Sequence, residues 1–77
     1  MNQMIIPVNM TVIEWADQMN EAVSQYGDVA KLLDPKDWQF WALSVILSNE
    51  QWEAVIPNPY SFTDWREWAE LFIGNVN

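Results

Sequence analysis

The side chains best suited to acid–base chemistry in this chain are its 11 carboxylates, because the sequence contains neither histidine nor cysteine. A general acid or base that works at neutral pH is usually a histidine or a carboxylate whose pKa is shifted by burial. Six of the carboxylates recur at helical intervals in two groups: Glu14, Asp17 and Glu21, and Asp64, Glu67 and Glu70. Residues at this spacing share one polar helix face, which is typically solvated. We therefore expect no catalytic residue among them.

Serine nucleophiles, phosphate-binding loops and metal sites also lack the residues that they need. No histidine base is available to any serine, and no serine stands in a Gly-x-Ser-x-Gly turn. Two glycines are too few for a Walker or dinucleotide loop. The acidic residues lack the alternating spacing and central glycine of a calcium loop, and no thiolate can hold zinc. We expect a protein that is not an enzyme and has neither a cofactor nor a metal site.

The composition indicates a small acidic domain that is rich in aromatic residues. A chain of 77 residues forms a single domain. Its six Trp, three Phe and two Tyr can fill the core, because each such side chain buries roughly 150–250 Å². The net charge of −8 repels phosphates and attracts basic surfaces. Hydrophobic residues make up 51% of the chain, unlike in acidic disordered tails. We expect a folded domain that does not bind nucleic acid directly.

The first helix is the clearest element in the sequence. Thr11 and Glu14 have the spacing of a capping box, and a helix is expected from Thr11 to Tyr26, with Gly27 as its left-handed terminator. Its apolar stripe should comprise Val12, Trp15, Ala16, Met19, Ala22, Val23 and Tyr26. Residues 1–10 contain an apolar stretch interrupted by Pro7 and are predicted to form an extended arm. The arm could fold back over the core or pair with a partner.

A second long helix follows a short connection. A helical turn is expected between Asp28 and Leu33, and Asp34 and Pro35 have the residue types of a helix cap and a first helical position. The helix from Pro35 to Leu47 is apolar on nearly all sides, which is typical of the middle of a fold or of an interface.

The C-terminal part predicts two further helices. Ser48 and Gln51 have capping-box spacing for a short helix, and residues 57–60 contain two prolines that indicate a stiff connector. A final helix should be capped by Ser61 or Thr63 and end near Ile73, before Gly74. The predicted core is Trp15, Met19, Trp41, Val45, Trp65 and Phe72. The expected fold is a single all-α domain, a bundle of three to five helices.

One internal similarity suggests two hypotheses. Residues 37–42 and 64–69 both read Asp-Trp-x-x-Trp-Ala at the start of a helix. The match could reflect a duplicated unit or a paired Trp platform. It could equally arise because helix starts favour Asp and because Trp at this spacing fills one buried stripe.

Two kinds of surface could support binding to another protein. The first is the acidic helix faces, where carboxylates about 5–6 Å apart could mimic the charges of DNA and occupy a basic groove. The second is surplus apolar surface, found in the second helix, in the arm and at Leu71. The candidate partner-binding residues are Glu14, Asp17, Glu21, Asp64, Glu67, Glu70 and Leu71. A homodimer is also plausible, because the second helix must be covered by something.

No motif in the sequence identifies a family. In its style, a compact Trp-rich acidic chain without Cys or His, the protein resembles small bacteriophage accessory proteins. One function that agrees with this resemblance is an inhibitor that docks on a basic, nucleic-acid-handling host protein, and the net charge of −8 favours it. The alternatives are a virion structural or assembly protein and a bacterial adaptor subunit. No secretory signal or apolar run of roughly 20 residues is evident, so we expect no membrane partner and a cytoplasmic location, in the host cytoplasm or the virion if the protein is viral.

Overall fold

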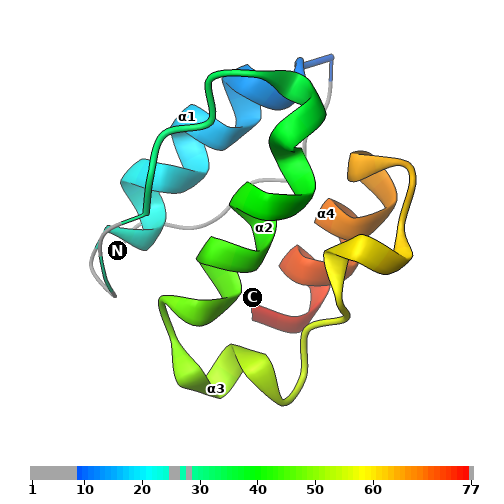
Figure 1. The fold of residues 1–77 in the computed structure, drawn as a ribbon. Helices are drawn as coiled ribbons and strands as arrows, with labels where there is room; N and C mark the ends of the chain where they lie inside the picture. The colour runs from blue at the N-terminus through cyan, green and yellow to red at the C-terminus, as the bar shows by residue number, and fades with distance from the viewer. Residues whose placement is uncertain (1–8, 25–26, 28, 77) are drawn as a thin grey trace.

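Four α-helices and two short 3-10 helices occur in the part of the chain that the computed structural model describes, which is residues 9–24, 27 and 29–76 (Figure 1). In chain order they are α1 (Val12–Val23), η1 (Pro35–Asp37), α2 (Trp38–Leu47), α3 (Glu50–Glu53), η2 (Pro59–Ser61) and α4 (Trp65–Val76). No strand occurs among these described residues. The predicted all-α bundle is confirmed. The predicted arm, residues 1–10, lies almost wholly outside the described residues.

The start and the buried face of α1 agree with the prediction. The Thr11 hydroxyl accepts from the Glu14 amide at 3.2 Å, and the Glu14 carboxylate accepts from the Thr11 amide at 2.9 Å. Each partner satisfies an amide that the helix leaves free. The residues that α1 buries are Val12, Trp15, Ala16, Met19, Ala22 and Val23. The helix ends at Val23, and the predicted end at Tyr26 lies outside the described residues.

The predicted helix from Pro35 to Leu47 consists of two elements. The Asp34 carboxylate accepts from the Lys36 amide at 3.1 Å, and Pro35 opens the 3-10 helix η1. α2 begins only at Trp38 and buries Trp38, Trp41, Ala42, Val45 and Ile46. The tighter first turn is a common way in which an α-helix begins.

The caps predicted for the last two helices are wrong. At α3 the cap is Asn49, whose extended backbone lets its side chain accept from the Gln51 amide. Ser48 cannot take that role because it ends α2, and its hydroxyl donates to the carbonyl of Val45 at 2.6 Å. At α4 the carboxylate of Asp64 accepts from the Arg66 amide at 3.0 Å. The predicted cap Ser61 belongs to η2, and Thr63 also lies outside α4.

The two glycines and the connection after α1 also differ from the prediction. Neither glycine has a positive φ. Gly27 lies against Ser48 at the end of α2, while Gly74 is a helical residue, since α4 continues to Val76. Within residues 29–33 no helical turn forms. Leu32 is buried and its neighbour Leu33 is 81% exposed, so this segment presents its side chains to opposite sides.

The three long helices all begin at the same end of the molecule (Figure 1). Two hydrogen bonds tie these ends together. Arg66 at the start of α4 donates to the carbonyl of Met10 before α1 at 2.9 Å, and Gln39 in α2 donates to the carbonyl of Phe62 before α4 at 2.7 Å. At the opposite end, the ring of Trp52 in α3 meets Phe72 in α4 edge to face, with ring centroids 5.2 Å apart.

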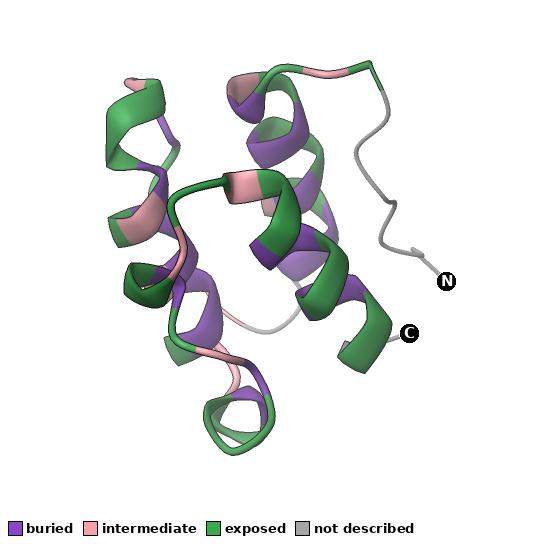
Figure 2. Cartoon of the chain, turned by 90° about the vertical axis from the view of Figure 1, so that its right-hand side faces the viewer, coloured by how far each residue is buried: buried purple, intermediate pink, exposed green. Residues whose placement is uncertain are grey.

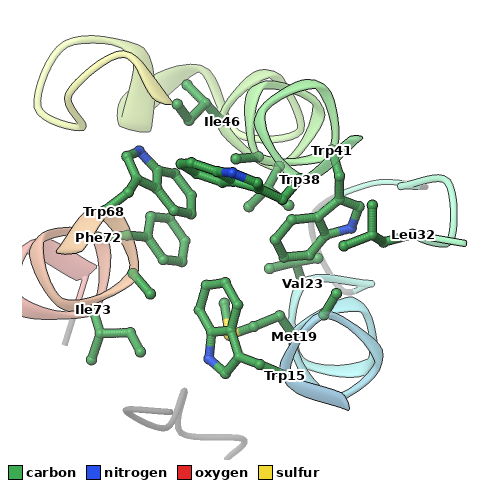
Figure 3. Close-up of a cluster of buried hydrophobic side chains, with 14 of the residues drawn as sticks. Trp15, Met19, Val23, Leu32, Trp38, Trp41, Ile46, Trp68, Phe72 and Ile73 are labelled. Carbon is green, nitrogen blue, oxygen red and sulfur yellow. The ribbon is translucent and has the colours of Figure 1, made fainter. Parts of the chain in front are cut away.

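Indole rings fill the space between the helices (Figure 3). Trp15 of α1 lies 5.5 Å from Trp41 of α2 and 6.3 Å from Trp68 of α4, edge to face in both pairs. Trp68 also stacks on Phe72 at 5.1 Å and lies 6.3 Å from Trp38. The inward sides of the helices are buried and the outward sides are exposed (Figure 2). Aromatic burial on this scale allows so short a chain to build a core.

Five of the six predicted core residues are buried, and Trp65 is half-buried. Of the four indoles in the repeated Asp-Trp-x-x-Trp-Ala segments, Trp38, Trp41 and Trp68 point into the core and Trp65 is half-buried, which favours packing over a paired Trp platform. The spacing of these indoles serves packing.

Candidate protein-interaction site

The residues predicted to bind a partner are all exposed. They lie on two helices and their starts, with Glu14, Asp17 and Glu21 on α1, Asp64 directly before α4, and Glu67, Glu70 and Leu71 on α4. α1 and α4 are neighbours, since the ring of Trp15 lies 5.5 Å from that of Trp65. The outward surfaces of both helices are therefore open to a partner.

Two of these carboxylates already have a structural role. Glu14 closes the capping box with Thr11, and Asp64 caps α4. The hydrogen bonds from the backbone amide and side chain of Thr11 hold the pKa of Glu14 below its ordinary value, because they favour the charged carboxylate. Sequence spacing indicated the role of Glu14 but missed that of Asp64.

The other four carboxylates, Asp17, Glu21, Glu67 and Glu70, have no hydrogen bond or ion pair within the described part of the chain. The one ion pair among the described residues joins Lys36 to Asp34 at 3.5 Å, at the start of η1. Four solvated negative charges on neighbouring helices are thus available for external contacts.

Arg66 is the cationic residue between these two acidic faces, and its side chain is already engaged. Its guanidinium lies 4.7 Å from the ring centre of Trp65 and donates to the carbonyl of Met10. It therefore joins the starts of α1 and α4 instead of pairing with the carboxylates. Sequence analysis did not predict this contact, because Arg66 and Met10 are 56 residues apart.

A second exposed surface runs along α2. Phe40 and Leu47 are 64% and 59% exposed, respectively, and Leu43 between them is half-buried. These residues follow helical spacing, so they form one stripe on the outer face. Leu33 from the preceding connection lies beside its first turn, where Leu33 and Phe40 line a hollow of about 210 Å³. We refer to Leu33, Phe40, Leu43 and Leu47 as the apolar stripe.

No group of three or more Asp or Glu residues that could hold a metal ion occurs in the described ranges. No helix among the residues that the structure places is both long and apolar enough to cross a membrane. Comparison of the chain with protein-family models, curated proteins and solved structures finds no match.

Proposed function

We propose that the protein is a non-enzymatic binding module that docks through the outer faces of α1 and α4 onto a basic surface of another protein. The observation that carries this proposal is the set of four exposed carboxylates, Asp17, Glu21, Glu67 and Glu70, which have no described partner within the chain. We call these four the free acidic set.

The chemistry of the partner follows from charge. A body of net charge −8 accelerates encounter with a basic surface and repels acidic ones. Basic grooves on proteins are commonly built to hold nucleic acid. Carboxylates one helical turn apart present negative charges at a spacing of about 5–6 Å, so the two helix faces can occupy such a groove in place of a phosphate backbone. The biological consequence would be inhibition of a nucleic-acid-handling protein.

Leu71 would add an apolar contact to the charged contacts of the free acidic set. It lies among the acidic residues of α4 and is 46% exposed. Charges at the edge of an interface act mainly on the rate at which two proteins associate, whereas an apolar side chain buried in the interface slows their dissociation. The two residue types together would give both fast encounter and lasting contact.

The test begins by immobilising the protein and capturing partners from the heparin-binding fraction of a bacterial lysate. For a captured protein, we measure whether the wild-type chain displaces bound DNA. We expect displacement by wild type and a slower association rate as salt is raised, because salt screens charges beyond about 8 Å at physiological ionic strength. The paired reversals Asp17→Lys with Glu21→Lys, and Glu67→Lys with Glu70→Lys, should each weaken displacement.

A matched control separates position from net charge. Glu50→Lys with Glu53→Lys changes the net charge by the same amount at exposed residues of α3. We expect this control to displace DNA better than either reversal in the free acidic set. Equal loss in all three variants would refute a localised docking face. If the reversals have no effect while Leu71→Ser abolishes binding, the contact is apolar, as expected for an assembly protein or an adaptor subunit.

A further inference from the structure

α2 is unusual for so acidic a chain because none of its own residues is charged, although Lys31 and Asp37 line the hollow at its first turn. α2 contains no Asp, Glu, Lys or Arg, although the whole chain has 14 charged residues. The apolar stripe occupies this face, with Leu33 and Phe40 at its first turn and Leu47 at its last. Exposed apolar surface of this kind marks an interface more often than an accident of packing. Because α2 itself has no carboxylate, two copies can approach along this helix without bringing acidic side chains of α2 together.

The stripe is also nearly symmetric about Leu43. Phe40 lies three residues before Leu43 and Leu47 lies four residues after it. If two copies of α2 pack antiparallel with their Leu43 residues at a twofold axis, Phe40 of each copy meets Leu47 of the other. A twofold interface requires this self-complementarity, because the same surface serves both partners.

The charges that flank the stripe fit the same arrangement. Lys31 and Lys36 lie at its N-terminal end, together with Asp34 and Asp37, so that end has no net charge. At the C-terminal end, Glu50 and Glu53 of α3 are exposed. Because the three long helices begin at the same end, their dipoles add, with the positive pole beside the lysines.

Antiparallel packing would place the neutral, dipole-positive end of each copy against the acidic, dipole-negative end of the other. Parallel packing would instead place the two pairs of glutamates together. Lys36 in η1 lies seven residues before Leu43, and Glu50 in α3 lies seven residues after it. The antiparallel register therefore places η1, which carries Lys36, at the same end of the interface as the start of the other copy's α3, which carries Glu50.

We propose that the apolar stripe binds a second copy of this chain in an antiparallel twofold dimer. This self-association does not depend on the acidic docking function, because it uses α2 and its flanks, whereas the free acidic set lies on α1 and α4. In the dimer each copy still presents its free acidic set to solvent.

The first experiment is sedimentation equilibrium of the wild-type chain from micromolar to millimolar concentration. We expect a reversible monomer–dimer equilibrium. Leu47→Gln should raise the dimer dissociation constant about tenfold or more, because each dimer loses the burial of two leucine side chains. Leu71→Gln is the matched control, since it changes the same residue type at an exposed position on α4. It should leave the dissociation constant unchanged.

The second experiment tests the register with a short bis-maleimide cross-linker, which is feasible because the chain has no native cysteine. Lys36→Cys and Glu50→Cys are prepared as separate variants at exposed positions. The mixture of the two should cross-link more than either variant alone. A chain that stays monomeric at millimolar concentration, an unchanged dissociation constant in Leu47→Gln, or cross-linking of Lys36→Cys mainly with itself would overturn the proposal. Leu47→Gln should still displace DNA in the docking assay, so failure of one proposal can be told from failure of the other.

Discussion

Replacing Trp15 with Ala removes the side chain that joins all three long helices. Trp15 is fully buried on α1, and its ring contacts Trp41 on α2 and both Trp65 and Trp68 on α4. The methyl group of an alanine at this position would lack all of these ring contacts. The loss of Trp15 should therefore weaken the packing of α1 as a whole.

The size of the effect follows from the buried area. Full burial of an indole removes roughly 150–250 Å² from water, which at about 25 cal/mol per Å² corresponds to about 4–6 kcal/mol. The true figure is lower because unfolded chains already bury part of this area, and about 3–5 kcal/mol is the usual cost of Trp→Ala in a core. A domain of 77 residues is stable by only about 4–12 kcal/mol.

The measurement is thermal unfolding followed by far-UV circular dichroism, with urea unfolding as a second probe. We expect the Tm of Trp15→Ala to fall by at least about 12 °C, because each kcal/mol shifts the Tm of so small a domain by about 4–8 °C. The control is Val55→Ala, at a residue that is 54% exposed, which should change stability by less than about 0.5 kcal/mol. A Trp15→Ala variant that melts with the wild-type chain would show that the indoles do not support the fold as described.

Two further predictions concern the helix starts. Asp64→Ala should destabilise the protein by about 0.5–2 kcal/mol in urea unfolding, because the Arg66 amide loses its acceptor. Asp64→Asn retains an acceptor oxygen and should lose less stability. Equal stability of Asp64→Ala and the wild-type chain would show that Asp64 does not cap α4. The folded-state pKa of Glu14 is lowered by its bonds to Thr11, so its contribution to stability should be present above the unfolded-state pKa of about 4.3 and disappear as pH falls through the lower folded-state pKa. Thr11→Ala should reduce that pH dependence, and an unchanged acid-unfolding profile in this variant would contradict the assignment.

The elements that could be predicted from sequence are those specified by neighbouring residues. The capping box of Thr11 and Glu14 needs only a fixed local spacing, and the six buried residues of α1 follow from helical periodicity. The cap at Asp34 follows from the sequence for the same reason. Each of these features depends on residues within a few positions of one another, so the chain carries the information locally.

The errors occurred where several local solutions compete. Ser48 and Asn49 both have side chains that can cap a helix. Asn49 caps α3 because the Ser48 backbone remains helical at the end of α2. Gly74 has the residue type of a helix terminator, yet α4 continues past it. Propensity is too weak to decide between such alternatives, and tertiary packing overrides it.

The charge and apolar surplus of the protein were evident from the sequence alone, as were the two groups of carboxylates that share helix faces. Only the tertiary structure decided which carboxylates remain free and which apolar residues stay exposed. Arg66 donates to the carbonyl of Met10 because the starts of α1 and α4 lie next to each other. Phe40 and Leu47 remain exposed because no described element packs over the outer face of α2. Contacts between distant segments depend on how the helices are arranged in space, and helical periodicity specifies which face is apolar without specifying what covers it.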